Sequence, residues 1–462
     1  MSGVPPLVLD RDSAVPLSVQ LADALRDAAA HGTVRPGDRL PSTRELAGAL
    51  RVSRTVTAAA FDQLLAEGWA QSRRGVGTFV VGAAAPGRAT PAVAPPDVAA
   101  RPRLVDLRAG SPCLEVLDAA AWRRAWRTAG DQEPDGYPEP AGDPGFRAAV
   151  TEHLLRHRGL PAAAEDVLAT AGTSAAVAEV ARLLPPGSRV AVESPGYGRA
   201  AAALRAAGAV VVPVPVDDDG LVVDALPPGL AAVYCTPAHQ YPLGRRLSAA
   251  RRVALVARAR AEGWWVLEDD YDGELRYDVA PLPLLAALDP GVVVHLGTAS
   301  KILTPTLGTG WLVAPPEVRA QLLARRIETG TRPARAGQRV FAALATGGDL
   351  ARHLRRLRRE LVGRRQLVLA ALEAGGCRAE GDPAGAHVLV PLPDTGTETA
   401  VLAAAAARGV ALDGLGRHRT HEPASGPRAG LVLGFAAPAR AELDRALDVL
   451  SAVLRDASLQ PL

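Results

Sequence analysis

One stretch of this chain divides it into two parts. Residues 82–103, GAAAPGRATPAVAPPDVAARPR, are almost all Ala, Pro, Gly and Arg and show no hydrophobic periodicity. A composition of this kind is typical of a semi-extended linker. The 462 residues suffice for two or three domains, and 48% apolar residues with 22% charged residues indicate folded globular structure. We therefore predict two domains, residues 13–81 and residues 104–458, joined by the linker 82–103.

Other features exclude some classes of protein. The N-terminus has no charged segment followed by an apolar stretch, and no run of 18 apolar residues occurs, so we expect a cytoplasmic protein that does not enter membranes. Cys113, Cys235 and Cys377 have neither the spacing of a metal site nor that of a disulfide framework, and we expect no metal centre. A net charge of +3 is too small to indicate nucleic acid by itself.

Residues 13–81 have the pattern of a small helical domain with a hairpin. Leucines recur at helical spacing in PLSVQLADALRDAAAHG, residues 16–32. A second helix begins after Ser42 and a third after Ser53, with only a short turn between them. Two short strands on either side of Gly75-Val76-Gly77 follow. The segment is therefore predicted to be an α+β winged helix-turn-helix.

The charge of this segment favours binding to double-stranded DNA. Between Arg35 and Arg74 seven arginines stand against four acidic residues, and they gather at the turn and at the hairpin. A recognition helix presents its first turn to base edges, and a basic wing can follow phosphates or enter the minor groove. A solvated charged face on a structural domain is the alternative. The predicted DNA contacts are Arg44, Ser53, Arg54, Thr55, Thr57, Arg73 and Arg74.

Residues 104–458 alternate short apolar runs with alanine-rich helical stretches, which predicts an α/β domain with a mainly parallel sheet. Ligands of such a sheet bind beyond the carboxyl ends of the strands. The loops that follow five predicted strands should therefore form one crevice. The strands are VLAT, RVAVE, AAVYC, WWVLE and VVVHL, and their loops are residues 171–174, 194–197, 236–240, 269–271 and 297–301.

The last of these loops holds Lys301, the only lysine among 52 Lys and Arg residues. Arginine remains protonated at any accessible pH, whereas a primary amine can lose its proton and form an imine with an aldehyde. Chance survival in an arginine-biased composition is the alternative. Lys301 is therefore the predicted catalytic residue of this crevice.

The other loops offer partners for an aromatic phosphate. Gly172-Thr173-Ser174 at a helix start present N–H groups and hydroxyls to a phosphate. The Asp269 carboxylate can pair with a protonated ring nitrogen, and Tyr197 can stack on the ring. Taken singly, these residues are equally compatible with an N-cap, a loop cap and a core aromatic. A ligand with a phosphate, a protonated aromatic ring nitrogen and an aldehyde that forms an imine with Lys301 is pyridoxal 5′-phosphate (PLP).

Two resemblances support these interpretations. RLPSTRELAGALRVSRTVTAAAFDQLLAEGWAQSRRGVGTFV resembles the DNA-binding head of the GntR family of bacterial transcription regulators. YPEPAGDPGFRAAV, TAGTSAA, ESPGYG, TPAHQYPLG, EDDYDGELRY and GTASKILTP, in this order, are similar to the aminotransferase-like domain of its MocR branch. That branch fuses a winged helix to a fold-type I, PLP-binding domain. The resemblance covers residues 13–315 strongly and the remainder weakly.

The resemblance implies roles for single residues. Lys301 is then the lysine that carries the cofactor, Asp269 the partner of the pyridine nitrogen and Tyr271 a donor to the ring oxygen. It also implies a head-to-tail homodimer, and it favours Arg44, Arg54 and Thr57 among the DNA contacts. The predicted cofactor contacts are Lys301, Asp269, Tyr271, Tyr197, Gly172, Thr173, Ser174, His239, Thr298 and Ser300.

The chain departs from the family at two arginines. Seven residues after the lysine the family commonly has an arginine near the phosphate, whereas this chain has Gly308. Many fold-type I enzymes grip the substrate carboxylate with an arginine on a late strand, which here reads GLVLGF with Val432 and Leu433; Arg428 lies in a predicted loop. Loss of a bidentate clamp reduces catalysis more than cofactor binding. We therefore expect weak or no transaminase activity.

Two functions from different classes follow. The first is a transcription regulator whose second domain senses PLP or an amino compound and transmits the change through residues 82–103. The second is a working PLP-dependent aminotransferase that carries a winged helix. A third possibility is an inert scaffold in which PLP no longer binds.

The winged helix generates the first prediction. Arg54→Ala should weaken operator binding by about 1–3 kcal/mol, because a base-edge contact from the recognition helix is lost. Titration of the full chain with its own upstream DNA measures this change. An unchanged affinity and footprint would remove Arg54 from the contacts.

Overall fold

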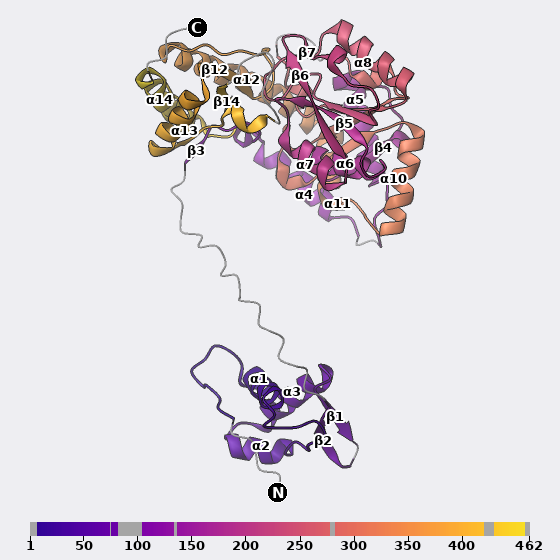
Figure 1. Ribbon diagram of the computed structural model, residues 1–462, viewed down its shortest axis with the longest axis vertical. Coiled ribbons are helices and arrows are strands. Elements are labelled where there is room, and N and C mark those ends of the chain that lie inside the picture. Colours follow the sequence, from indigo (N-terminus) through magenta and orange to yellow (C-terminus); the bar gives the residue numbers. More distant parts are fainter. Residues whose placement is uncertain are drawn as a thin grey trace. The chain divides into compact units, whose positions relative to one another are not determined.

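The computed structural model describes residues 7–73, 75–81, 104–133, 136–277, 282–419 and 429–457. The chain divides into two compact units, residues 1–101 and residues 102–462 (Figure 1). The predicted linker 82–103, together with Arg74 and Arg428, lies outside the described residues. Among the described helices, none is long and apolar enough to cross a membrane.

The first unit is a winged helix, as predicted. Its apolar residues, among them Leu21, Leu46 and Phe61, pack into one core beneath three helices and a hairpin. Ser42 and Glu45 form a capping box that starts the second helix, and the Ser53 side chain accepts from Val56 N at the start of the third. The elements are α1 (Leu17–Ala30), α2 (Thr43–Leu50), α3 (Arg54–Ala66), β1 (Ala70–Arg73) and β2 (Gly77–Val80), with the two strands antiparallel.

The second unit is built on an eight-stranded sheet, ordered β4-β11-β10-β9-β8-β5-β6-β7. Strands β4, β10, β9, β8, β5 and β6 run in one direction, while β11 and β7 run against their neighbours. The sheet is therefore mainly parallel, as predicted. Its strands are β4 (Val167–Thr170), β5 (Arg189–Ser194), β6 (Val210–Asp217), β7 (Gly220–Leu221), β8 (Ala232–Cys235), β9 (Trp265–Asp269), β10 (Val293–Thr298) and β11 (Gly310–Val313).

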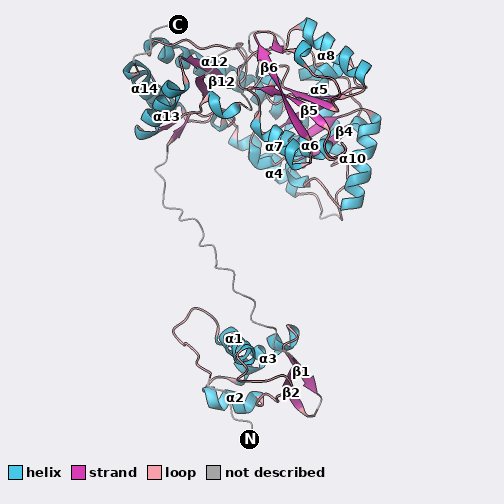
Figure 2. Ribbon diagram, in the orientation of Figure 1, coloured by secondary structure: helices cyan, strands magenta, loops and turns pink. Residues whose placement is uncertain are grey.

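Helices cover both faces of this sheet (Figure 2). Alternate residues of a strand point to opposite faces, so Leu267 packs in one core cluster and Val266 in the other. One cluster includes residues of α6 (Thr173–Ala181), α7 (Gly198–Ala206) and α10 (Pro316–Thr329). The other includes residues of α4 (Ala119–Gly130), α5 (Pro144–Arg158), α8 (Ala249–Glu262), α9 (Leu285–Leu288) and α11 (Arg335–Thr346).

The C-terminal part of the unit adds a smaller layer of strands and helices. Strands β12 (His387–Leu392) and β14 (Ala429–Gly434) pair antiparallel, and β13 (Val410–Ala411) pairs parallel with β3 (Val105–Asp106). Helices α12 (Asp349–Ala374) and α14 (Arg440–Asp456) pack against each other, and α13 (Thr395–Ala407) packs on β13 and β14. This layer brings the start of β12 toward the ends of the central strands.

A buried ion pair fixes the loop after β9. The Arg158 guanidinium donates to both carboxylate oxygens of Asp270, at 2.6 and 2.8 Å, and both side chains are fully shielded from solvent. Arg158 is the last residue of α5, and Asp270 immediately follows the last residue of β9. The pair therefore ties the helix to the loop that carries Asp269.

Removing this arginine should destabilise the second unit. Arg158→Met leaves Asp270 buried without its counter-charge, which costs about 3–5 kcal/mol of unfolding free energy. Arg156→Met on the same helix is the control, because Arg156 is 69% exposed and its pair with Glu152 lies at the surface. Urea unfolding followed by tryptophan fluorescence compares the two variants. Equal losses from both would contradict a structural role for the buried pair.

Candidate functional site

The five predicted loops line one cavity of about 670 Å³. Four of its wall residues, Gly172, Tyr197, Asp269 and Lys301, come from the ends of four different strands. Thr236, after β8, represents the fifth loop. The volume is in the range of cavities that bind small molecules. The common direction of the strands thus brings together residues that lie up to 129 positions apart.

Lys301 projects into this cavity from the turn after β10. Its ammonium group donates a hydrogen bond to the carbonyl of Gly110. Burial lowers the pKa of Lys301, while Asp269 and Asp272 oppose this effect. On the same turn the Thr298 hydroxyl donates to Ser300 Oγ at 3.0 Å and accepts from Ser300 N at 3.1 Å. Thr298 and Ser300 both line the cavity beside the lysine.

Asp269 presents one free carboxylate oxygen. The Tyr234 hydroxyl donates to Oδ2 at 2.6 Å, whereas Oδ1 has no hydrogen-bond partner within the described part of the chain. Asp269 is 3% exposed, and burial raises the pKa of its carboxyl to about 7 despite the bond from Tyr234. A buried acceptor of this kind is suited to a cationic N–H group of a ligand in the cavity.

The N-terminus of α6 forms another part of the wall. Its N-cap is Gly172, at φ 123°, and no side chain caps the first turn. The N–H groups of such a turn attract an anion. Ser174 Oγ lies 3.3 Å from the hydroxyl of Tyr197, whose ring meets that of Tyr241 edge-on at 5.9 Å. Gly172, Thr173, Ser174 and Tyr197 therefore lie together on the cavity wall.

His239 is the exception among the predicted cofactor contacts. It does not line the cavity and is 2% exposed. Tyr271, which does line it, donates from its hydroxyl to the His239 carbonyl at 3.0 Å. His239 thus holds the wall residue Tyr271 through its carbonyl, and its own side chain is not part of the wall. The sequence does not determine side-chain direction in the loop 236–240.

Gly308 and Val432, the two positions at which the resemblance led us to expect an arginine, have different surroundings in the structure. Gly308 has φ 54°, and a Cβ at this position would meet no atom within 4 Å among the described residues. Val432 is fully buried in an apolar cluster with Leu389 and Leu415. The side chain at this position of the late strand is therefore enclosed by hydrocarbon. Other arginines do line the cavity, namely Arg108, Arg199 and Arg417.

The predicted DNA contacts lie mostly on one exposed region of the winged helix. Arg44, Ser53, Arg54 and Thr55 are exposed at the starts of α2 and α3. Thr57 differs from the prediction. Its side chain is fully buried and donates to the carbonyls of Thr43 and Arg54 at 3.0 Å, so it joins α2 to α3.

The hairpin of the first unit carries a further predicted contact. Arg73 is exposed at the end of β1, and its guanidinium carbon lies 4.7 Å from the centre of the Phe79 ring. This contact holds the arginine along the hairpin. Val76, beside the turn, is 51% exposed. Arg74 lies outside the described residues.

Sequence reasoning missed several residues of the cavity wall. Tyr234 lies inside β8, where a hydroxyl at the end of an apolar run was the available signal. His387, Arg417 and His418 come from the C-terminal layer, in which no motif indicated a site. They reach the cavity through long-range pairing that one sequence does not reveal.

The fold and the site define a class: a winged helix joined to a PLP-type aminotransferase fold. The chain matches the bacterial regulatory protein gntR family over residues 17–80 and aminotransferase class I and II over residues 102–450. The kynurenine aminotransferase of Pyrococcus horikoshii, solved with PMP, is 26% identical with a TM-score of 0.69 over 77% of this chain and 91% of that chain. Aminotransferases of this family depend on PLP, and gntR-type domains bind DNA.

Two relatives that cover most of this chain are regulators by name. The HTH-type pyridoxine biosynthesis transcriptional regulator PdxR of Corynebacterium glutamicum is 36% identical over 79% of this chain and 80% of its own. A Rhizobium meliloti protein named "Probable rhizopine catabolism regulatory protein MocR" is 34% identical over 93% and 92%. The chain therefore belongs to the GntR-family transcription regulators with an aminotransferase-like domain, the MocR type. These names favour a regulator over an aminotransferase that carries a winged helix.

Asp269 provides a pH-dependent test of the site. Because burial raises its pKa from 3.8 to about 7, the folded cofactor-free chain keeps a proton that the unfolded chain has already lost. The unfolding free energy should therefore fall as the pH rises between about 4 and 7, and Asp269→Asn should remove this part of the fall.

Urea unfolding of the cofactor-free protein at about pH 5 and about pH 8 measures this difference. Burial also raises the pKa of Glu193 to about 7, so the variant keeps the contribution of that second carboxyl. The same decrease in the wild type and in Asp269→Asn would show that Asp269 is ionised in the folded chain.

Proposed function

We propose that this protein is a PLP-dependent transcription regulator that binds operator DNA through residues 13–81 and a small-molecule effector through residues 104–458. One observation carries the proposal. The only lysine of the sequence, Lys301, lines the same cavity as Asp269, whose buried oxygen Oδ1 lacks a hydrogen-bond partner among the described residues. The effector is PLP itself or an amino compound. We propose the cytoplasm as the location of the protein, because that is where a bacterial regulator meets its operator DNA.

The residues of the cavity fit PLP at each of its functional groups. The uncapped first turn of α6, with Thr173 and Ser174, suits the phosphate, with Thr298 and Ser300 beside it. Asp269 Oδ1 suits a protonated ring nitrogen, because an ion pair there compensates the cost of burying the carboxylate. These contacts would hold the two ends of the molecule.

Three further residues would complete the site. Tyr197 would cover one face of the ring, and Tyr271, held by the His239 carbonyl, would face the ring oxygen. PLP, when bound, supplies an aldehyde that reacts reversibly with amines. Burial helps Lys301 to lose its proton, which makes its amine available for this attachment.

The absence of arginine at Gly308 and Val432 favours a regulator that binds its ligand over an enzyme that converts it. Transamination needs the substrate carboxylate held in one orientation, and Val432 stands in an apolar cluster where a clamp would be required. We therefore propose weak or no transaminase activity. A change in the cavity would reach the DNA through residues 82–103 in a head-to-tail homodimer, with Arg44, Ser53, Arg54, Thr55 and Arg73 as DNA contacts.

Lys301→Arg tests the attachment. The substitution keeps the charge and the approximate length but removes the amine that can lose its proton, so the absorbance near ~420 nm should vanish. Borohydride reduction of the wild type with PLP, followed by peptide mapping, should find the mass of the cofactor on the peptide that contains Lys301. The alternative amine is the N-terminus. Cofactor mass there alone, or on neither peptide, would refute the assignment.

A further inference from the structure

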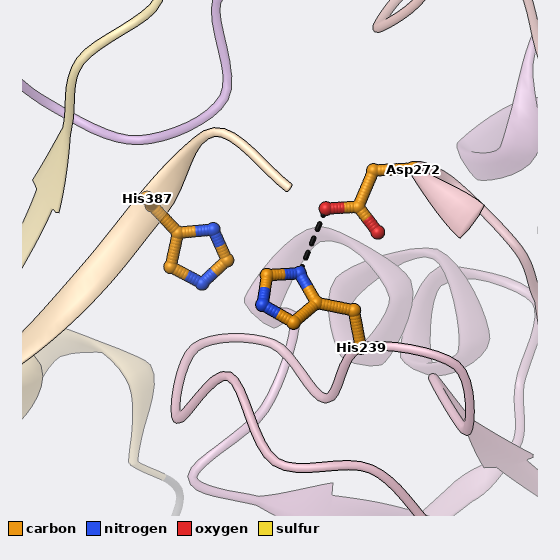
Figure 3. A group of neighbouring side chains, drawn as sticks. All are labelled: His239, Asp272 and His387. Carbon is orange, nitrogen blue, oxygen red and sulfur yellow. Dashed lines mark hydrogen bonds and ion pairs between the residues drawn. The ribbon is translucent and has the colours of Figure 1, made fainter. Parts of the chain in front are cut away.

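Three buried polar side chains meet at one side of the cavity: His239, Asp272 and His387 (Figure 3). They are 2%, 4% and 5% exposed and come from the loop after β8, the loop after β9 and the start of β12. One possible ligand atom from each lies within 4.8 Å of those of the other two. The PLP proposal gives no chemical task to His387 and uses His239 only through its carbonyl.

The hydrogen-bond partner of His239 fixes its tautomer. His239 Nδ1 lies 2.8 Å from Asp272 Oδ2, the contact drawn as a dashed line in Figure 3. A carboxylate accepts, so the proton of the neutral ring lies on Nδ1 and Nε2 presents a lone pair. His239 Nε2 is buried and has no hydrogen-bond partner in the described ranges of the chain.

His387 reaches the cluster from the start of β12, in the C-terminal layer. His387 Nε2, also buried, is likewise left without a partner among the residues that the structure describes.

The two imidazole rings lie close together. The ring centroids are 4.8 Å apart with the planes tilted by 44°, and Figure 3 shows the imidazoles turned toward one another. Two buried nitrogens that lack hydrogen-bond partners are unfavourable unless a cation or a donor reaches them. An imidazole oriented by a carboxylate, as His239 is by Asp272, is an arrangement that metal-binding histidines adopt.

Glycines make this arrangement possible. A Cβ at Gly385 would lie 2.4 Å from Asp272 Oδ2 and 2.5 Å from the His239 ring, so only glycine allows the close approach. A Cβ at Gly244 would lie 3.3 Å from His239 Nε2. Gly385 also has φ 64°, in the region that favours glycine. The backbone is thus shaped around the histidine and its carboxylate.

We propose that His239 Nε2 and His387 Nε2 bind one divalent late transition-metal ion, with Zn²⁺ as the representative. Asp272 acts as the positioning residue that holds His239 and offsets the charge of the ion. Asp272 and His387 line the cavity, so the remaining coordination positions are open to water or to a donor atom of a ligand there. Two imidazoles select Zn²⁺ or a neighbouring transition metal over Mg²⁺ and Ca²⁺, which prefer oxygen. The proposal does not depend on PLP binding.

Zinc titration of the full chain tests this site. The protein is prepared without a histidine tag, stripped with a chelator and titrated with Zn²⁺ in competition with a chromophoric chelator. We expect one equivalent per chain. Asp272→Asn should weaken binding about 10–100-fold, as loss of an orienting partner typically does, and His239→Gln and His387→Gln should weaken it further.

A matched control separates ligation from damage to the fold. His353 is also buried, at 3% exposed, and contacts the Ile302 carbonyl at 2.7 Å, away from the cluster. His353→Gln should therefore leave zinc affinity unchanged. Circular dichroism and thermal unfolding establish that each variant is folded.

A measurement on the wild type keeps the proposal testable if variants fail to fold. X-ray absorption of the zinc-loaded chain should show two imidazole nitrogens at about 2.0–2.1 Å. Three results would overturn the proposal: no zinc retained against the chelator, full affinity in folded His239→Gln or His387→Gln, or a zinc spectrum without imidazole. Nuclear magnetic resonance that finds a proton shared between the two rings in zinc-saturated protein would also overturn it.

Discussion

The common direction of five strands is the constraint on which the site depends. Because β4, β5, β8, β9 and β10 all run the same way, their carboxyl ends meet at one edge, and their loops line one cavity. The antiparallel strand β11 lies between β4 and β10 without reversing either of them. Helices on both faces hide the sheet from water, so the open edge is the place where polar side chains can face a ligand.

Burial at this edge of the sheet determines the protonation of Asp269 and Lys301. Desolvation raises the pKa of Asp269 and lowers that of Lys301, so each group is moved toward its neutral form. A ligand with a cationic ring nitrogen and an aldehyde matches both changes. Next to Asp269, the Arg158–Asp270 pair compensates a second buried carboxylate and holds the loop in place. Two adjacent residues therefore have different roles. Asp270 is paired with Arg158 and stabilises the fold, whereas Asp269 has no internal counter-charge and is available to a ligand.

Much of the architecture could be predicted from local sequence patterns. The runs VLAT and AAVYC correspond to β4 and β8. Helices α2 and α3 begin directly after Ser42 and Ser53, with a short turn between the helices as predicted. These predictions succeed because apolar runs and capping residues act locally. Side-chain direction could not be predicted. Thr57 was expected to contact DNA, yet its side chain is buried and donates to the Thr43 carbonyl. The side chain of His239 is likewise buried, and its carbonyl accepts from the Tyr271 hydroxyl.

Contacts between segments that are distant in the sequence could not be predicted either. Arg158 and Asp270 are 112 residues apart, and His387 reaches the cavity only because the C-terminal layer packs against the central unit. Nothing in the sequence near His387 indicates a partner for it. The same limit applies to Val432, whose apolar side chain was expected from the sequence, whereas its packing against Leu389 and Leu415 was not.

We propose that ligand binding in the cavity changes DNA binding by the winged helix. Operator affinity of the full chain, measured with and without saturating PLP, tests this directly. Linkage requires that PLP changes operator affinity by the same factor by which operator DNA changes PLP affinity. The account predicts a reciprocal change that is lost in Lys301→Arg. Identical operator affinity and identical footprints in the presence and absence of PLP would contradict it.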